Sequence, residues 1–301
     1  MKFKYKKDLP KRLDKYLADT IDSTSRNQLQ KLIKKGYVKV DGNINKKRSF
    51  KLKKGNIIEV TFPEEPEIKL EPKNIELDIL YEDDFLAVVN KPSGMLVHPT
   101  KHQRTNTLAN ALLYHFENVS ELQKIRPGIV HRLDKYTSGI MIVAKNNKTH
   151  RKLSKMIQNK EIKRKYWSIL KGSLSKPTGE IIAPIGRNPS NRTKMDVVLD
   201  GKFAHTNYVV LENFNNYVLV EFSLKTGRTH QIRVHAQFIG APVIGDPKYG
   251  GTITDDRLKF IKRQLLHSKK LSFEHPITDE KIDLESDLPE DFSKALKILK
   301  N

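Results

Sequence analysis

The hydrophobic positions of the first 60 residues recur first with helical and then with strand spacing. Leu13 and Leu17 lie four residues apart, and Leu29, Leu32 and Ile33 form one apolar stripe that ends before a glycine. This spacing predicts two short amphipathic helices. Two alternating segments with glycine turns follow, YVKVDGNI and KKGNIIEV. They predict a small sheet after the helices, so the N-terminal segment is expected to be a small α/β module.

The remainder of the chain alternates short apolar runs with a few helical patterns and contains no visible internal repeat. The predicted strands are FLAVVN, GIMIVAK, KYWSILKG, AHTNYVVLENF and YVLVEFSLK. The predicted helices are TLANALLYHF, NKTHRKLSKMIQN and DFSKALKILK. Helices inserted between hairpin-like pairs of strands indicate an α+β fold with a large mixed, mainly antiparallel sheet, because regular βαβ winding would alternate strand and helix.

A change in composition separates the two regions. The segment PEEPEIKLEPKNIE is acidic and punctuated by proline, which is typical of a linker. We therefore predict an N-terminal module over residues 1–62, a linker over 63–76 and a larger domain over 77–301.

Charge and composition narrow the classes of function. The chain carries a formal net charge of +21, and residues 1–60 hold 18 Lys and Arg against 6 Asp and Glu, a net of +12. This concentration of positive charge favours a polyanionic partner, whereas lysine-rich surfaces alone can also serve solubility. No apolar run reaches the length of a membrane span, and the N-terminus has no apolar secretory signal, so we expect a cytoplasmic protein without a membrane partner. With 0 cysteines, disulfides and thiolate chemistry are excluded.

The sequence lacks the patterns that bind common cofactors. No glycine-rich phosphate loop is present, so use of a nucleoside triphosphate or dinucleotide is not expected. The best local histidine cluster is TGRTHQIRVH, but His230 and His235 would not converge on one ion either on a helix or on a strand. We therefore expect neither a metal nor another cofactor.

Asp134 is the strongest candidate for a reactive group. It lies in HRLDKYTSGIMIVAK, just before a Thr-Ser-Gly turn and a continuous apolar run that is typical of a central strand. A carboxylate at the mouth of such a strand is held by a rigid scaffold and can still reach a cleft. On the spacing of Arg132 and Asp134 alone, however, a structural ion pair is the better interpretation. Asp246, in GDPKYGG, is the competing carboxylate and has a turn signature.

The order of motifs resembles two known families. The segments RLDKYL, SRNQLQKLIKKGYVKVDG and KKGNIIEV resemble the small RNA-binding module first recognised in ribosomal protein S-four. The larger domain resembles the RluA type of ribosomal RNA pseudouridine synthase, through the segments YEDDFLAVVNKPSGMLVHP, HRLDKYTSGIMIVAK, KRKYWSILKG, TGRTHQIRVHAQFIGAPVIGDPKYG and LLHSKKLSFEHP.

This resemblance implies an isomerase and gives roles to individual residues. Asp134 would be the essential catalytic residue, Arg233 would lie against it and hold it ionised, and Tyr166 would stack on the target uracil. Arg132 would enter the RNA stack in place of the extruded nucleotide, because the reacting bonds cannot be reached inside a stacked helix. Residues of the N-terminal module would bind RNA phosphates, namely Arg12, Arg26, Lys31, Lys34 and Lys35. The reaction changes no redox state and transfers no group, which agrees with the expectation of no cofactor.

The resemblance leaves several alternatives open. Asp134 could act by covalent attack or by removing the ribose 2′ proton to form a glycal. Structured RNA is the implied partner, with ribosomal RNA of the large subunit preferred to transfer RNA, and no obligate protein partner is inferred. A non-catalytic RNA-binding protein on the same scaffold and a metal-dependent nuclease are the rival interpretations.

Overall fold

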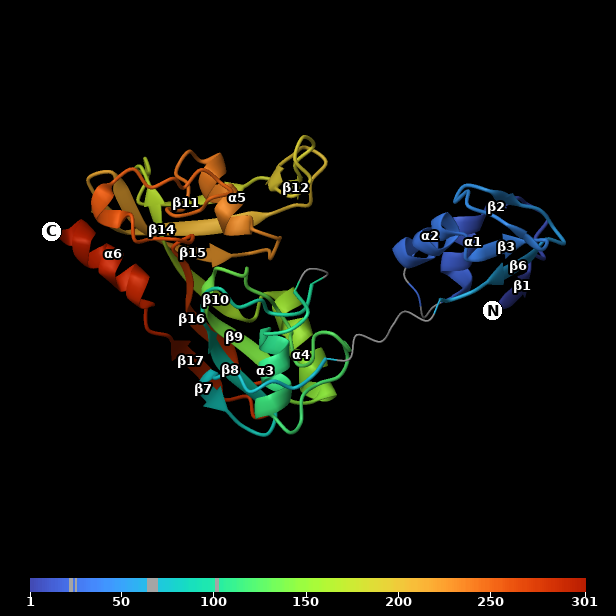
Figure 1. The fold of residues 1–301 in the computed structure, drawn as a ribbon, viewed down its shortest axis with the longest axis horizontal. Coiled ribbons are helices and arrows are strands. Elements are labelled where there is room, and N and C mark those ends of the chain that lie inside the picture. Colours follow the sequence, from blue (N-terminus) through green and yellow to red (C-terminus); the bar gives the residue numbers. More distant parts are fainter. Residues whose placement is uncertain (22–23, 25, 64–69, 101–102) are drawn as a thin grey trace. The chain divides into compact units, whose positions relative to one another are not determined.

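The computed structural model describes residues 1–21, 24, 26–63, 70–100 and 103–301. The chain divides into two compact units, Met1–Ile68 and Lys69–Asn301, and each is described by itself (Figure 1). The division falls inside the predicted linker, of which residues 64–69 lie outside the described part. Among the described residues no helix combines the length and apolar character needed to cross a bilayer.

Unit 1 consists of two helices and short strands around one apolar core. Its elements are β1 (Lys2–Lys4), β2 (Lys11–Arg12), α1 (Leu13–Thr20), α2 (Arg26–Lys35), β3 (Val38–Val40), β4 (Asn43–Ile44), β5 (Lys51–Leu52) and β6 (Ile57–Val60). The predicted stripes of both helices meet in the core, where Leu13, Leu17, Leu29 and Ile33 are each 0% exposed. Gly36 follows α2 with φ of 84°, the left-handed conformation that suits a glycine at a helix end.

A buried carboxylate ties the two helices of unit 1 together. Asp14, on α1, is enclosed and accepts hydrogen bonds from Arg12, Arg26 and Gln30. Burial raises the pKa of Asp14, but the bonds from the two guanidinium groups and the amide outweigh it and lower the pKa to about 2. The ionised form therefore stabilises the packing of α1 against α2.

Unit 2 is built on one large sheet with the strand order β11-β14-β15-β10-β16-β9-β8-β7, and β17 pairs with β16. The strands are β7 (Asp78–Glu82), β8 (Leu86–Lys91), β9 (Ser138–Ala144), β10 (Lys163–Lys171), β11 (Thr178–Ile182), β14 (His205–Phe214), β15 (Tyr217–Leu224), β16 (Leu266–Glu274) and β17 (Lys281–Glu285), and β12 (Ile185–Arg187) forms a separate hairpin with β13 (Met195–Val197). Pairing is antiparallel except between β9 and β16. The predicted fold class, α+β with a mixed, mainly antiparallel sheet, is confirmed.

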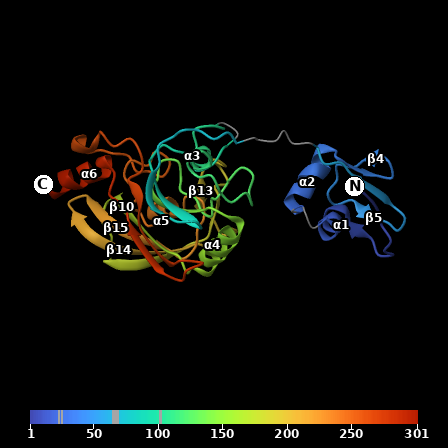
Figure 2. The same ribbon diagram turned by 90° about the horizontal axis from the view of Figure 1, so that it is seen from below.

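Helices cover both faces of this sheet. These are α3 (Leu108–His115), α4 (Asn147–Asn159), α5 (Gln231–Phe238), α6 (Glu290–Lys300) and the short helix η1 (Asp256–Leu258). Helices α3 and α5 pack on the face that carries Tyr166, whereas α4 packs against the opposite side chains of β8 and β9. Helix α6 lies beside β10 and β15, as Figure 2 shows, and Phe292 contributes its buried ring to the core there.

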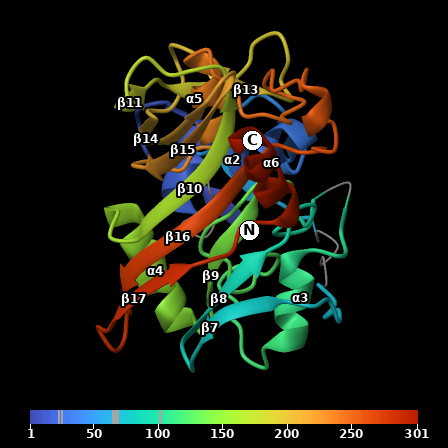
Figure 3. The same cartoon turned by 90° about the vertical axis from the view of Figure 1, so that its left-hand side faces the viewer.

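The parallel contact of β9 with β16 lies just behind the loop that carries Asp134. Gly139 pairs with Ser268 and has φ of 111°. A Cβ added at Gly139 would lie 2.3 Å from the carbonyl oxygen of Ser268, so only glycine lets the two backbones approach this closely. Figure 3 shows β10, β16 and β9 running side by side through the middle of the unit. Sheet packing therefore requires glycine at position 139. The predicted Thr-Ser-Gly turn is wrong, because Ser138 and Gly139 already belong to β9.

Part of the predicted linker packs on unit 2. The Asn110 side chain, on α3, donates to the carbonyl oxygen of Glu71, and the amide of Lys73 donates to the carbonyl oxygen of Asn110. Leu70 packs against the main core of the sheet. This part of the predicted linker is thus packed on α3 and belongs to unit 2.

Candidate active site

Asp134 lies in the loop that precedes β9, with its side chain 18% exposed. Its backbone carbonyl accepts a hydrogen bond from the amide of Thr137 at 3.1 Å, which closes the turn into the strand. Leu133, just before it, is buried in the core of the sheet. The loop is thus anchored on both sides of the carboxylate, which faces outward from a rigid base.

A buried lysine reinforces this loop. Lys91 ends β8, is 0% exposed, and donates from Nζ to the carbonyl oxygens of Pro92 at 2.7 Å, Met95 at 3.0 Å and Lys135 at 3.2 Å. Burial and nearby Arg263 lower the pKa of Lys91 to about 7, while Asp134 opposes that shift. The three bonds connect the loop after β8 to the residue that follows Asp134.

Arg233 binds Asp134 and a second carboxylate at once. On α5, its Nη1 donates to Asp134 Oδ2 at 2.9 Å, and its Nε and Nη2 donate to the two oxygens of Asp246 at 2.6 and 3.0 Å. Burial alone would lower the pKa of Arg233, but the bonds and charges of Asp246 and Asp134 raise it above its usual value. Arg233 therefore stays charged and is fixed by Asp246 in the orientation that holds Asp134.

Asp246 combines the turn that its sequence predicts with a contact that its sequence does not show. Its Oδ1 accepts from the amides of Lys248 at 2.9 Å and Tyr249 at 3.2 Å, as a turn residue does. The same carboxylate is 0% exposed and holds Arg233. Sequence reasoning missed this second contact because the partner lies on another element.

His230 and Tyr249 complete the group around Asp134. His230 precedes α5, its Nδ1 lies 2.7 Å from the hydroxyl of Tyr249, and its Nε2 lies 3.9 Å from Asp134 Oδ1. The ring of Tyr249 lies under the guanidinium of Arg233, with 4.9 Å between the guanidinium carbon and the ring centroid. Neither residue was singled out as a candidate at the active site, although both lie in the quoted motifs beside Arg233 and Asp246.

Tyr166 lies where the sheet faces this group. It is on β10, opposite Phe222 of β15 and Ser268 of β16, next to a register shift between Lys165 and Tyr166. Its ring is only 4% exposed, and it lines the hollow beside Asp134 together with Ile232 and Arg233. The three residues predicted to be catalytic, Asp134, Arg233 and Tyr166, thus come together from three separate elements.

A basic cleft of about 650 Å³ opens in front of Asp134. Its walls are the Asp134 loop, the end of α4, the start of β10 and the loop between β15 and α5. It is lined by one carboxylate, Asp134, and by the basic residues Arg132, Lys160, Arg164, Lys225 and Arg228. Such a lining attracts an anionic chain while leaving one carboxylate at its floor. In the described ranges, no three His, Asp or Glu side chains are grouped as metal ligands.

The predicted RNA-binding residues lie in two places. Arg132 is exposed and lines the cleft of unit 2. The others are exposed on unit 1, namely Arg12, Arg26, Lys31, Lys34 and Lys35. Arg12 and Arg26 also pair with buried Asp14, so their guanidinium groups are held in place by the fold.

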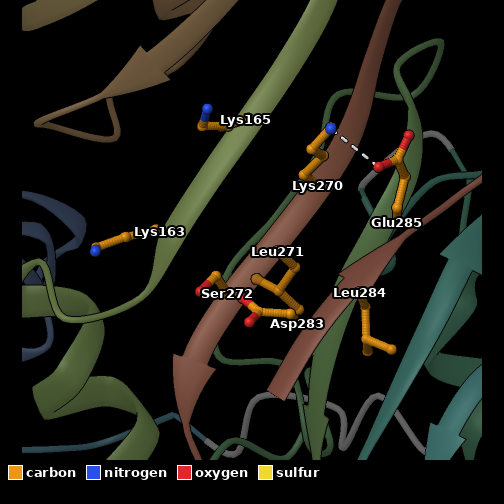
Figure 4. Close-up of a pocket in the computed structure, with 8 residues that line it drawn as sticks. All are labelled: Lys163, Lys165, Lys270, Leu271, Ser272, Asp283, Leu284 and Glu285. Atoms are coloured by element: carbon orange, nitrogen blue, oxygen red, sulfur yellow. Dashed lines mark ion pairs between the residues drawn. The ribbon is translucent and has the colours of Figure 1, made fainter. Parts of the chain in front are cut away.

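A second cleft, of about 350 Å³, lies between β10, β16 and β17 (Figure 4). Lys163 and Lys165 line it, whereas Arg164 and Tyr166 line the cleft at Asp134, because side chains alternate along β10. Lys270 pairs with Glu285, and Lys165 pairs with Glu221. Its charges are therefore largely balanced, and it is separate from the chemistry at Asp134.

The fold, the cleft and the S4-like unit together define an RNA-modifying enzyme, and the chain belongs to the RNA pseudouridylate synthase family. The family profile matches residues 85–238, and that of the S4 domain matches residues 11–58. The chain is thus an isomerase of RNA uridines with an RNA-binding domain.

Individual relatives agree with this assignment. An uncharacterized RNA pseudouridine synthase, YlyB of Bacillus subtilis, is 44% identical over 96% of this chain and 94% of its own length. The ribosomal large subunit pseudouridine synthase D of Haemophilus influenzae is 40% identical over 96% of this chain and 91% of its own length. The structure of human RNA pseudouridylate synthase domain containing 4 matches with a TM-score of 0.59 and 28% identity, over 74% of this chain and 93% of that one.

Proposed function

We propose that this enzyme converts one or more uridines of large-subunit ribosomal RNA to pseudouridine, with Asp134 as the catalytic carboxylate. The observation that carries the proposal is the Asp134–Arg233 pair, 2.9 Å long, at the floor of a basic cleft. The relatives named for the large ribosomal subunit support the choice of RNA. We further propose that the protein acts in the cytoplasm, where this RNA is made and assembled in bacteria.

In this proposal Arg233 leaves one oxygen of Asp134 free for chemistry. Oδ2 accepts the bond from Arg233, whereas Oδ1 accepts no hydrogen bond from a described residue and lies 3.9 Å from Nε2 of His230. An ionised carboxylate oxygen can attack ribose C1′ as the bond from C1′ to the uracil nitrogen breaks, or remove the ribose 2′ proton as the same bond breaks and a glycal forms. In both routes the released uracil turns and bonds to C1′ through its carbon 5, which then loses its proton, and the enzyme is regenerated. Tyr166 offers the face or edge of its ring to the uracil, and Arg132 fills the space that the flipped nucleotide leaves in the RNA.

In the same proposal, unit 1 binds RNA through contacts with its phosphates. Lys31, Lys34 and Lys35 are exposed on or beside one face of α2, and Arg12 and Arg26 are held near them by Asp14. Contacts of this kind position RNA without reading its sequence. They raise RNA affinity at low salt. The logarithm of the binding constant falls with the logarithm of the salt concentration, with a slope of about 0.7 to 0.9 for each phosphate contact.

The proposal is tested by mapping pseudouridines in large-subunit ribosomal RNA from cells with and without the gene. A disrupted gene should abolish pseudouridine at defined positions, and wild-type protein should restore them. The Asp134→Asn variant should not restore them, whereas the matched control Asp256→Asn should, because Asp256 is an exposed residue of η1 that pairs with Lys259 at the surface. An unchanged map after disruption would refute the choice of RNA, and restoration by Asp134→Asn would refute the role of Asp134.

A further inference from the structure

The neutral imidazole of His230 is a hydrogen-bond donor aimed at the place where the reacting nucleotide must bind. Resting on the function proposed above, we propose that His230 donates from Nε2 to an acceptor oxygen of the flipped uridine, either the ribose 2′ hydroxyl or a uracil carbonyl. His230 would then be a catalytic residue in addition to Asp134, Arg233 and Tyr166. The argument depends on which nitrogen carries the proton, where that nitrogen points, and what else it contacts.

The hydrogen bonds around Tyr249 favour one tautomer of His230. The amide of Met195 donates to the Tyr249 hydroxyl oxygen at 3.0 Å, so the hydroxyl proton is available for the other neighbour, His230 Nδ1, at 2.7 Å. Nδ1 then accepts the hydrogen bond from the Tyr249 hydroxyl and carries no proton of its own. In a neutral imidazole the proton must then be on Nε2.

The surroundings of His230 favour this neutral form. Burial lowers the pKa of His230 below its usual value, and the positive charges of Arg233 and Lys248 lower it further, while Asp134 and Asp246 oppose them. A doubly protonated ring would also turn Nδ1 into a donor and leave the Tyr249 hydroxyl proton without its acceptor. The neutral ring therefore adds a donor to the site without adding a charge that would compete with Arg233 for Asp134.

Among the described residues, none accepts a hydrogen bond from Nε2 of His230. Its distance of 3.9 Å from Asp134 Oδ1 is too long for a hydrogen bond. Both side chains remain partly exposed, His230 by 20% and Asp134 by 18%, and both line the cleft. A nucleotide that reaches Oδ1 must therefore pass beside Nε2, and an oxygen on its ribose or uracil can accept the bond.

His230 has a backbone conformation that residues other than glycine seldom adopt. Its φ and ψ are 58° and 21°, the left-handed region, and α5 begins at the next residue. This conformation costs a residue other than glycine roughly 1 kcal/mol or more, and such strain occurs most often at functional sites. Asparagine tolerates the same conformation, which makes it a suitable replacement in a test.

Two variants distinguish loss of the hydrogen-bond donor from damage to the fold. His230→Asn keeps a polar side chain that suits the backbone but places nothing at the position of Nε2. His230→Gln carries an amide nitrogen far enough to replace Nε2 as a donor. We expect His230→Asn to lower the single-turnover rate by about tenfold or more, as loss of one hydrogen bond predicts, and His230→Gln to recover part of it, with thermal stability close to that of the wild type.

Nucleotide analogues identify the acceptor. An RNA stem-loop with the mapped target is made with uridine, 2′-deoxyuridine, 2-thiouridine or 4-thiouridine at that position. The loss caused by His230→Asn should persist on three of these substrates and disappear on the one that lacks the accepting oxygen, which distinguishes the ribose hydroxyl from either uracil carbonyl. An equal loss on all four, or none on uridine, would overturn the inference.

Nuclear magnetic resonance of the full-length protein tests the tautomer without activity. With ¹⁵N-labelled histidine, His230 should show a protonated Nε2 and an unprotonated Nδ1 near neutral pH, and Tyr249→Phe should abolish that preference. A proton on Nδ1 in the wild type would overturn the inference. Absence of pseudouridine formation by wild-type protein would instead refute the proposed function, so the two failures can be told apart.

Discussion

Arg233 Nη1 donates a hydrogen bond to Asp134 Oδ2 at 2.9 Å, although the two residues are 99 positions apart in the sequence. The same guanidinium is held on its other side by Asp246 through two bonds. The orientation of Asp134 therefore depends on a buried carboxylate that does not face the cleft. This arrangement separates the group proposed to react from the group that positions it.

The first prediction concerns Asp246. Asp246→Asn replaces an acceptor of Arg233 by an amide that cannot accept both bonds, and should lower the rate of pseudouridine formation by about 10- to 100-fold, because Arg233 loses its fixed orientation. It should also cost about 3 kcal/mol of unfolding free energy, as breaking a buried ion pair does. The exposed carboxylate of Asp256 provides the control variant, Asp256→Asn. A wild-type rate in Asp246→Asn, measured by single turnover, would contradict the positioning role.

The second prediction concerns Lys91. Lys91→Met keeps the length of the side chain but removes the Nζ donor of the Pro92, Met95 and Lys135 carbonyl oxygens. The Lys135 oxygen still accepts from the amide of Gly94 at 2.9 Å. The unfolding free energy should fall by about 2 kcal/mol or more, at about 1 to 3 kcal/mol for each of the two oxygens left unpaired, those of Pro92 and Met95. Activity should fall as well, because the loop of Asp134 loses an anchor. Lys270→Met, which removes a half-exposed lysine of β16, is the control, and equal urea midpoints for the two variants would count against this account.

The third prediction concerns the RNA-binding unit. Asp14→Asn removes the ionised partner of Arg12 and Arg26, so hydrogen exchange in α1 and α2 should become faster, by the equivalent of about 1 to 3 kcal/mol. Because the pKa of Asp14 in the folded state is lowered to about 2, its stabilisation is present above the usual range of an aspartate and is lost as the pH falls through about 2. Asp19→Asn, at an exposed position of α1, should leave exchange unchanged. Equal protection in both variants would show that the buried carboxylate does not hold the helices together.

The fourth prediction concerns pH and His267. This residue of β16 is 0% exposed, with Nδ1 at 2.9 Å from Ser138 Oγ and Nε2 at 2.8 Å from Ser286 Oγ. Burial, with help from Lys269 and Arg263, lowers the pKa of His267 to about 3. Unfolding restores the ordinary pKa near 6.5, so the unfolded state binds the proton first as the pH falls. The stabilisation is therefore complete above about 6.5 and is lost between that pH and about 3, with a slope of at most about 1.4 kcal/mol per pH unit.

Urea unfolding at a series of pH values measures this slope. His267→Gln has no group that titrates in this range, so its unfolding free energy should depend less on pH between 6.5 and 4.5 than that of the wild type. The matched control is His115→Gln, because His115 is an exposed residue at the end of α3. Parallel pH profiles for wild type and His267→Gln would contradict the assignment.

Hydrophobic periodicity and capping residues predicted several elements correctly from the local sequence. The predicted helix over residues 147–159 coincides with α4, because its apolar stripe is regular and Asn146 caps its first turn by accepting from Thr149. The strands predicted at β8, β9, β10, β14 and β15 were likewise clear from continuous or alternating apolar residues. The hydrophobic pattern was sufficient for these long elements. It did not reveal the shorter strands β11 and β17, in which only Ile181 and Ile282 are buried.

The central strand β16 was missed because its burial is polar. His267, Ser268 and Lys269 are each at most 7% exposed. His267 and Lys269 are paired with Ser138 of β9 and with Ser286 after β17, whereas Ser268 Oγ is buried without a hydrogen-bond partner among the described residues.

The roles of Asp246 and His230 were missed because each depends on a polar partner elsewhere in the chain. A side chain whose function depends on a partner distant in sequence leaves no periodic pattern. The family motifs therefore identified Asp134, Arg233 and Tyr166. The fold was needed to place Asp246, His230 and Tyr249 around them.

The most direct test of the central claim is pseudouridine formation by purified Asp134→Asn protein. The assay follows tritium release from RNA labelled at uracil carbon 5, and filter binding to the same RNA is measured in parallel with Asp256→Asn as control. We predict no release above background for Asp134→Asn, RNA affinity close to that of the wild type, and wild-type turnover for the control. Turnover by Asp134→Asn at a rate near that of the wild type would contradict the account.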